Sequence, residues 1–149
     1  MRLVFMMTIG LIASSQSFSA QGQAKPVTVN IDDRSVVWGS CPPIFTPDCR
    51  ITVLHGNPAQ PNADVLLRIP AGAVLPAHSH TSAERMILVN GELAVRYKGS
   101  AVNTLKPGNY AFGPAGVPHE ATCKSASPCD LFIAFEGPVD AAAFEGSLD

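Results

Sequence analysis

Charged residues are scarce in this sequence. Only 15% of its 149 residues are Asp, Glu, Lys or Arg, the formal net charge is −2, and no run of like charge is longer than Asp32-Asp33. Proteins that bind nucleic acid need a clustered basic face to displace phosphate counterions, so the composition argues against that class. Because 46% of the residues are hydrophobic, the chain can bury enough apolar surface to fold.

The apolar stretch near the N-terminus is too short to span a membrane. Leu3–Ala13 is about half of the roughly 20 residues that a spanning helix needs. It follows Met1-Arg2 and is followed by small residues, which is the three-part pattern of a secretory signal peptide. We predict a signal peptide over approximately 1–22 and a periplasmic or secreted mature protein that has no membrane contact after cleavage.

Cysteine is used sparingly and never in the Cys-x-x-Cys spacing of redox motifs and zinc knuckles. The four cysteines fall into two close pairs, and disulfides persist in the compartment that export implies. Local pairing closes the shortest loops. We therefore predict the structural disulfides Cys41–Cys49 and Cys123–Cys129, the alternative being four buried thiols.

Helical periodicity is missing between short β-like runs, and the chain carries 13 Pro and 12 Gly. Strands that recur every dozen or so residues, bounded by turn residues, are typical of an antiparallel sandwich or barrel. The expected strands are 50–55, 64–69, 86–89, 92–97, 101–105, 121–123 and 131–135. The sequence predicts a single all-β domain.

The domain divides into three parts after the signal peptide. Residues 23–49 are expected to form an irregular extended arm and a Cys-tied loop, because they have several prolines and little periodicity. The barrel is expected over 50–136. The alanine-rich tail, 137–149, is expected to form one helical turn around Ala141–Phe144 or to fray.

Asn90-Gly91 is the sharpest turn signal, since a two-residue type I′ hairpin needs positive φ at both positions. Such a hairpin would place Glu84 opposite Tyr97. Alternation along both strands then predicts one inward face, formed by Glu84, Met86, Leu88, Leu93, Val95 and Tyr97. Phe112, Phe132 and Phe135 are also expected in the core.

Three of the four histidines fall in a spacing that metal binding would require. His78 and His80 are two apart, so on a strand both imidazoles point to the same face. Glu84 follows four residues later, and His119 lies in a Gly/Pro-flanked segment that can return beside them. An inward carboxylate needs a cation to balance its charge. Nitrogen and oxygen ligands suit one divalent ion: Fe, Mn, Zn, Ni or Cu.

These residues resemble the two motifs of the cupin superfamily. Gly72-x5-His78-x-His80-x3-Glu84-x6-Gly91 agrees with the first motif at every defined position, and Gly108-x5-Pro114-x-Gly116-x2-His119 agrees with the second up to its final Asn, where this sequence has Cys123. The resemblance implies a jelly-roll β-barrel and metal-ligand roles for His78, His80, Glu84 and His119. It also suggests, by analogy, a homodimer formed through an edge strand.

Other polar residues have plainer interpretations. Tyr97 could orient Glu84 or a substrate from behind the metal ligands, but an inward tyrosine that completes a barrel layer is the simpler interpretation. His55 ends a strand outside both motifs and is expected at the rim. Arg68 and Arg85 are expected to be surface cations.

Three functions fit such a site, and the superfamily resemblance does not choose among them. The first is a metal-dependent oxidoreductase of dioxygenase type that acts on a small chelating substrate, with Glu84 as the catalytic base. The second is a non-catalytic protein that binds or senses a metal or small ligand. The third is a metal-dependent isomerase or lyase.

Overall fold

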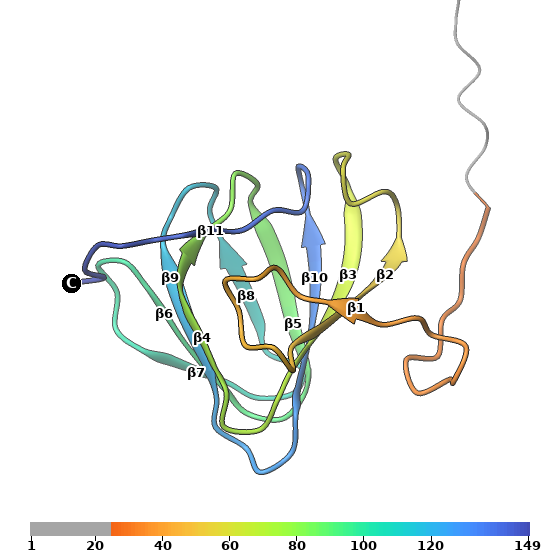
Figure 1. Ribbon diagram of the computed structural model, residues 1–149, viewed down its shortest axis with the longest axis horizontal. Helices are drawn as coiled ribbons and strands as arrows, with labels where there is room; N and C mark the ends of the chain where they lie inside the picture. The colour runs from red at the N-terminus through yellow and green to blue at the C-terminus, as the bar shows by residue number, and fades with distance from the viewer. Residues whose placement is uncertain (1–24) are drawn as a thin grey trace, which may run out of the picture.

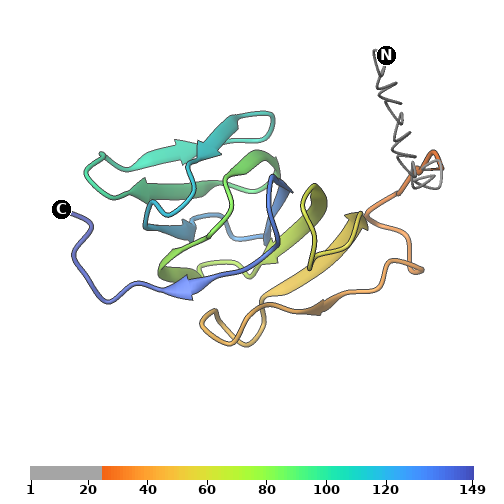
Figure 2. The ribbon, with the colours of Figure 1, turned by 90° about the horizontal axis from the view of Figure 1, so that it is seen from above.

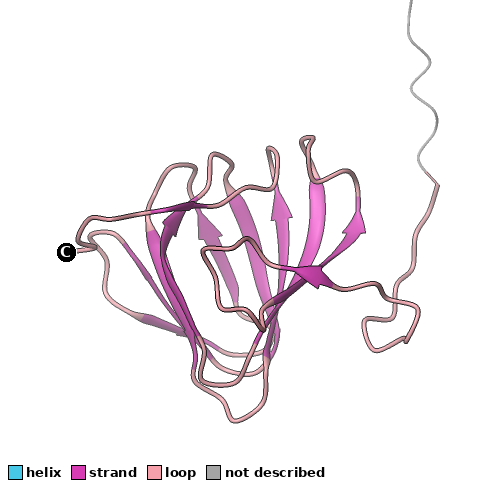
Figure 3. Ribbon diagram, viewed as in Figure 1, coloured by secondary structure: helices cyan, strands magenta, loops and turns pink. Residues whose placement is uncertain are grey.

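The computed structural model describes residues 25–149. The predicted signal peptide lies outside the described residues. Within them the chain forms eleven strands and no helix (Figure 3). The strands are β1 (Gly39–Ser40), β2 (Arg50–His55), β3 (Ala63–Ile69), β4 (Val74–Ser79), β5 (Glu84–Asn90), β6 (Leu93–Tyr97), β7 (Asn103–Leu105), β8 (Tyr110–Gly113), β9 (His119–Cys123), β10 (Cys129–Phe135) and β11 (Ala142–Ala143).

The strands form two antiparallel sheets that face each other (Figures 1 and 2). The larger sheet has the order β1-β2-β3-β10-β5-β8 and the smaller one β11-β4-β9-β6-β7. The core lies between them and takes alternate residues from both, which buries one face of each strand. Its members include Val65, Leu67, Ile69, Leu75, Met86, Leu88, Leu93, Val95, Leu105, Leu131, Ile133 and Phe135. The all-β prediction is confirmed.

All seven predicted strands are present, and four further strands were not foreseen as such: β1, β4, β8 and β11. β1 and β11 are two-residue edge strands, and β8 is an edge strand whose Tyr110 and Phe112 are exposed. The prediction that Phe112 is a core residue is therefore wrong. Phe132 is only half-buried, while Phe135 is buried as predicted.

The predicted hairpin at Asn90-Gly91 is also wrong. β5 pairs with β10 and β8, whereas β6 pairs with β9 and β7, so the two strands belong to different sheets. Gly91 has a positive φ of 88°, but Asn90 does not have the positive φ that a type I′ turn requires. The dipeptide is the point at which the chain crosses from one sheet to the other. The predicted inward face is nevertheless correct, because alternation does not depend on the partner strand.

The two terminal segments pack on the sheets. In the arm, Trp38 lies over the guanidinium of Arg68, 4.5 Å from the ring centroid, and Arg68 forms a two-pronged ion pair with Asp130. The tail does not form the expected helical turn and does not fray. Its β11 pairs with β4, and Leu148 is buried. Phe144 donates its backbone N–H to the carbonyl of Ala77, so the tail is hydrogen-bonded to the edge of the smaller sheet.

Both predicted disulfides are confirmed, Cys41–Cys49 and Cys123–Cys129. The first closes the loop between β1 and β2, and the second joins the end of β9 to the start of β10. Disulfides of this kind are typical of an oxidising compartment outside the cytoplasm. No segment of 25–149 forms a helix that could cross a membrane. The homodimer remains a prediction.

Candidate metal centre

A β-bulge in β4 brings His78 and His80 into the space between the sheets. Leu75 pairs with Ala121 and His78 pairs with His119, so β4 has three steps where β9 has two. Strict alternation from the buried Leu75 would turn Ala77 and Ser79 inward. The extra residue reverses the alternation, as bulges do near functional sites, and His78 and His80 are buried instead.

His119 and Glu84 reach the same place from the first residues of β9 and β5. His119 lies opposite His78 on one side and Tyr97 on the other. Glu84 lies between Gly113 of β8 and Phe135 of β10. Its side chain occupies the space over Gly113, where a Cβ atom would come within 2.5 Å of Oε1. Glycine is needed here because of this close approach.

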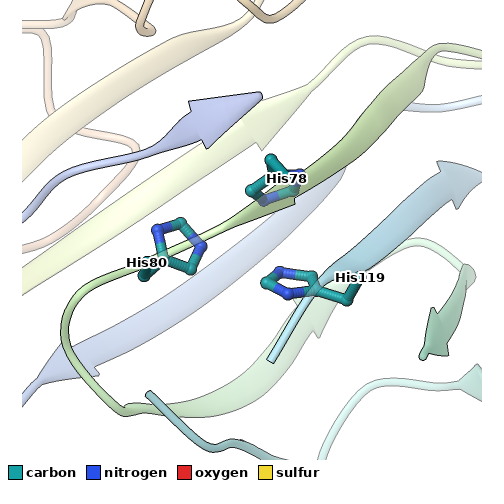
Figure 4. Close-up of side chains that lie close together, drawn as sticks. All are labelled: His78, His80 and His119. Atoms are coloured by element: carbon teal, nitrogen blue, oxygen red, sulfur yellow. The ribbon is translucent and has the colours of Figure 1, made fainter. Parts of the chain in front are cut away.

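The three imidazoles point toward one another (Figure 4). One ligand atom from each of His78, His80 and His119 lies within 4.8 Å of the others. The carboxylate of Glu84 completes the group. Its Oε1 is 3.2 Å from Nε2 of His119, and its Oε2 is 3.5 Å from Nε2 of His80. The structure thus brings together the four residues that the sequence singled out.

Backbone carbonyls orient all three rings. Nδ1 of His78 lies 2.7 Å from the carbonyl of Pro76, and Nδ1 of His119 lies 3.3 Å from that of Val117. Nδ1 of His80 faces the carbonyl of Asp140 in the tail. A carbonyl only accepts hydrogen bonds, so each Nδ1 carries the proton and each neutral ring presents its Nε2 lone pair to the centre.

Without a cation, burial disfavours the charged forms of all four residues. Burial raises the pKa of Glu84 to about 8 and lowers the pKa values of His78 and His119 to about 4 and about 3. The pKa of His80 is lowered by the same cause. Among the described residues, Glu84 Oε1 and the Tyr97 hydroxyl are the buried side-chain atoms with no hydrogen-bond partner. Lone pairs that face a carboxylate, with one oxygen unsatisfied, are the surroundings that a cation would complete.

The donor set fits a divalent metal ion. Three imidazole nitrogens and one carboxylate oxygen suit Fe, Mn, Zn, Ni or Cu. All four cysteines are in disulfides, so no thiolate competes for the site. His78, His80 and His119 could hold such an ion, with Glu84 as the fourth residue facing it.

The group opens into a cavity of about 50 Å³ between the sheets. A water molecule needs roughly 10–15 Å³ measured in this way, so the space suits an ion and a few ligand atoms. Apolar side chains form most of its wall, and neither Lys nor Arg contributes to it. Two segments outside the sheets complete the wall. They are the disulfide-closed loop, through Pro42 and Phe45, and the tail, through 139–141.

Residues 27–140 match the model of the ChrR cupin-like domain. The chain belongs to this cupin family. The match covers most of the arm and all strands except β11, and it includes all four residues of the metal centre. No match was found for this cupin among curated proteins.

Solved structures share the cupin fold. The DMSP lyase DddQ from Ruegeria pomeroyi is 25% identical, with a TM-score of 0.62 over 75% of this chain and 64% of that one. The match to a second DMSP lyase structure covers 63% of that protein's chain. The present chain therefore spans less than two thirds of the length of each of these two lyases. An RmlC-like cupin from Shewanella frigidimarina is 20% identical, with a TM-score of 0.60 over 78% and 93% of the two chains. Oxalate decarboxylase from Bacillus subtilis, described with Mn(II) centres, is 21% identical, with a TM-score of 0.51 over 62% and 26%.

The remaining candidate residues have varied positions in this cupin. Tyr97 pairs with His119 rather than with Glu84, but it lines the cavity, and its ring centroid is 5.0 Å from that of His119. His55 is exposed at the end of β2, away from the cluster, as predicted. Arg68 and Arg85 pair with Asp130 and Glu136 outside the cavity.

Three contributors were missed from the sequence: Gly113, Phe45 and the carbonyl of Asp140. Gly113 lies within the second cupin motif, at an undefined position directly before Pro114, so its place there was the one available signal. Phe45 has no such signal. A backbone carbonyl has none either, because every residue carries one.

Proposed function

We propose that this cupin is a mononuclear metal-dependent enzyme of dioxygenase type that acts on a small chelating substrate. One observation carries the proposal. The buried carboxylate of Glu84 faces Nε2 of two neutral imidazoles, and its Oε1 has no hydrogen-bond partner. A divalent ion held by His78, His80 and His119, with Glu84 beside it, accounts for that arrangement.

The ion would polarise a bound substrate as a Lewis acid. The other chemistry falls to side chains of this chain. Glu84 accepts a proton from the substrate at Oε1 or Oε2, because its carboxylate faces the centre and its Oε1 has no partner among the described residues. The hydroxyl of Tyr97, buried and unpartnered in the same cavity, donates a hydrogen bond to a substrate oxygen. The apolar wall excludes water from the reacting atoms.

The cavity supports one class of substrate. It is small, and no Lys or Arg in its wall would balance a second anionic group away from the metal. A compact molecule with two adjacent oxygens and no further charge fits this description, for example a diketone or a catechol.

The test begins with the metal recovered from protein exported in its native manner. Oxygen uptake is then measured with a panel of catechols, flavonols, diketones and oxalate. We expect close to one equivalent of a divalent metal and oxygen consumption with a small diketone or catechol. Glu84→Gln should keep the fold and lose most of the turnover. Oxygen uptake that is unchanged in Glu84→Gln would contradict the role of this carboxylate.

A second candidate is a metal-dependent lyase, favoured by the 25% identity with the DMSP lyase DddQ. Glu84 as the base would equally serve an elimination that needs no oxygen. DMSP is therefore tested beside the panel, and turnover of DMSP or of any panel compound under anaerobic conditions would favour the lyase over the dioxygenase. Ligand binding without a change in the mass of any panel compound would leave the non-catalytic binding function.

A further inference from the structure

We propose that Phe45 determines the size of the ligand that the metal centre accepts, and that the disulfide-closed loop 41–49 holds Phe45 in position. The inference rests on the proposed function, because it requires a ligand beside the metal. It adds a specificity-determining residue that lies outside both cupin motifs and precedes the first long strand in the chain.

Phe45 forms part of the cavity wall directly beside a metal-centre histidine. Its ring meets that of His78 edge to face, with centroids 4.7 Å apart and an angle of 77° between the planes. Pro42 from the same loop also lines the cavity. The loop follows β1 and extends toward β4 and β11 (Figures 1 and 2). A ligand that grows away from the metal on this side therefore meets the Phe45 ring.

Phe45 differs from the aromatic residue on the other side of the centre. Phe135, whose ring centroid is 5.4 Å from that of His80, is a fully paired strand residue and is 3% exposed. Phe45 is only partly buried. Shortening Phe135 would enlarge a closed interior, whereas shortening Phe45 would extend the cavity toward solvent. The size of the side chain at position 45 therefore determines how long a ligand the cavity can accept.

The loop has few ways to move Phe45 aside. The Cys41–Cys49 disulfide closes it, and Cys49 is fully buried. Three backbone hydrogen bonds brace its interior: Cys41 N–H to the carbonyl of Cys49 at 3.3 Å, Phe45 N–H to that of Pro42 at 3.0 Å, and Cys49 N–H to that of Thr46 at 3.0 Å. A side chain on a braced loop limits size more strictly than one on an open loop, because accepting a larger ligand would break these bonds.

The test uses two ligands that share one metal-binding group and differ in size. Cobalt(II)-loaded protein is titrated with acetohydroxamate and with benzohydroxamate, and binding is followed by the visible absorption of cobalt. We expect the wild type to prefer acetohydroxamate. Phe45→Ala should bind benzohydroxamate at least about tenfold more tightly than the wild type does, within the range that a change in pocket size produces. Its affinity for acetohydroxamate should change by less than about threefold.

Matched variants make the result specific. Asp48→Ala changes an exposed residue of the same loop and should behave as the wild type. Phe45→Leu should give an intermediate preference, and it serves as the second variant if Phe45→Ala does not fold. Val139→Ala shortens the partly buried residue that the tail contributes to the wall.

Two outcomes would overturn the inference, and a third would overturn the proposed function on which it rests. Equal selectivity in the wild type, Phe45→Ala and Phe45→Leu would show that Phe45 does not limit size. Gain of benzohydroxamate binding in Val139→Ala alone would move the limit to the tail. If neither hydroxamate binds the cobalt-loaded wild type or any cobalt-loaded variant, the result would instead contradict the ligand site of the proposed function.

Discussion

The two ends of the space between the sheets differ in how their buried groups are satisfied. β5, β6 and β9 each run from one end to the other. We call Leu88, Leu93, Cys123 and Cys129 the disulfide end, and His78, His80, Glu84, Tyr97 and His119 the histidine end. At the disulfide end the side chains are apolar or covalently joined. At the histidine end Glu84 and Tyr97 each bury a polar atom without a partner.

The turns near the disulfide end add to this contrast. Asn90 Nδ2 donates to the carbonyl of Pro128 at 3.0 Å, and the backbone N–H of Glu92 donates to Ser125 Oγ at 3.2 Å. On the same strands, the polar groups near the disulfide end are therefore hydrogen-bonded within the protein, whereas the histidine end leaves buried polar atoms that a ligand would satisfy. Sites that break the rules of burial are where function is expected, and stability has to come from elsewhere.

Removing one metal-binding side chain should produce the largest effect, a loss of metal affinity at the histidine end. His119→Ala leaves only residues of one continuous segment, 78–84, to face the ion. We expect metal affinity to fall by more than about 100-fold, because that is already the upper range for residues that merely support a ligand. Isothermal titration with the metal measures the loss. His55→Ala, which changes an exposed histidine, should bind metal as the wild type does; an equal loss in both variants would contradict the assignment.

Opening the disulfide end should have the opposite profile. The double variant Cys123→Ser and Cys129→Ser removes the cross-link between two residues that are six positions apart in the chain. The unfolded chain gains conformational entropy, so the free energy of unfolding should fall by about 2 kcal/mol. Urea unfolding measures this. Metal affinity should change by less than about threefold. A loss of affinity comparable to that of His119→Ala would show that the two ends are not independent.

Crowding Glu84 should produce a smaller change at the histidine end. In Gly113→Ala the new Cβ atom would displace the carboxylate, and we expect metal affinity to fall about tenfold with the fold intact. Gly39→Ala is the matched control. It is also a strand glycine, but its Cβ would lie an ordinary 3.7 Å from the nearest atom, the carbonyl oxygen of Ile51. Equal affinities for both variants would show that the position of Glu84 does not matter for the metal.

The smallest expected effect is a pH dependence of the metal-free protein. Burial raises the pKa of Glu84 from 4.5 to about 8, so its contribution to stability is complete below pH 4.5 and is lost as the pH rises through 8. His119 acts in the opposite direction. Its pKa falls from 6.5 to about 3, so its contribution is complete above pH 6.5 and is lost as the pH falls.

Between pH 6.5 and 8.5 only the loss from Glu84 remains, and the Tm of the metal-free protein should fall by about 5 °C. Thermal unfolding followed by circular dichroism measures it. Glu84→Gln and metal-loaded protein should show no such fall. A decrease of the same size in Glu84→Gln would assign the pH dependence to another group.

Local patterns in the sequence predicted more than pairing patterns did. Glu84, Leu88 and Val95 were placed on the inward face correctly although the hairpin used to argue it does not exist. Alternation depends only on neighbours in the chain, while the choice of partner strand depends on the whole fold. For the same reason both short-range disulfides were predicted and the pairing of β5 with β10 was not.

The geometry of the centre was predicted only in part. The spacing of His78 and His80 indicates that they share a face, but not which face, and the bulge in β4 decides that. Bulges have no reliable sequence signature unless a glycine marks them. The contribution of Asp140 comes from a carbonyl in a segment that was expected to be helical or frayed.

The position of that carbonyl in the chain also determines when, during synthesis of the polypeptide, the metal centre can be completed. Asp140 follows His80 by 60 residues, yet its backbone oxygen orients the His80 ring. His119, the last of the metal-facing residues, precedes Asp140 by 21 residues, which a ribosome that adds about 5–20 residues per second needs roughly 1–4 s to cover. A growing chain therefore carries all its metal-binding side chains before it carries the atom that aims one of them. The centre as the structure describes it therefore requires the chain to extend at least to Asp140.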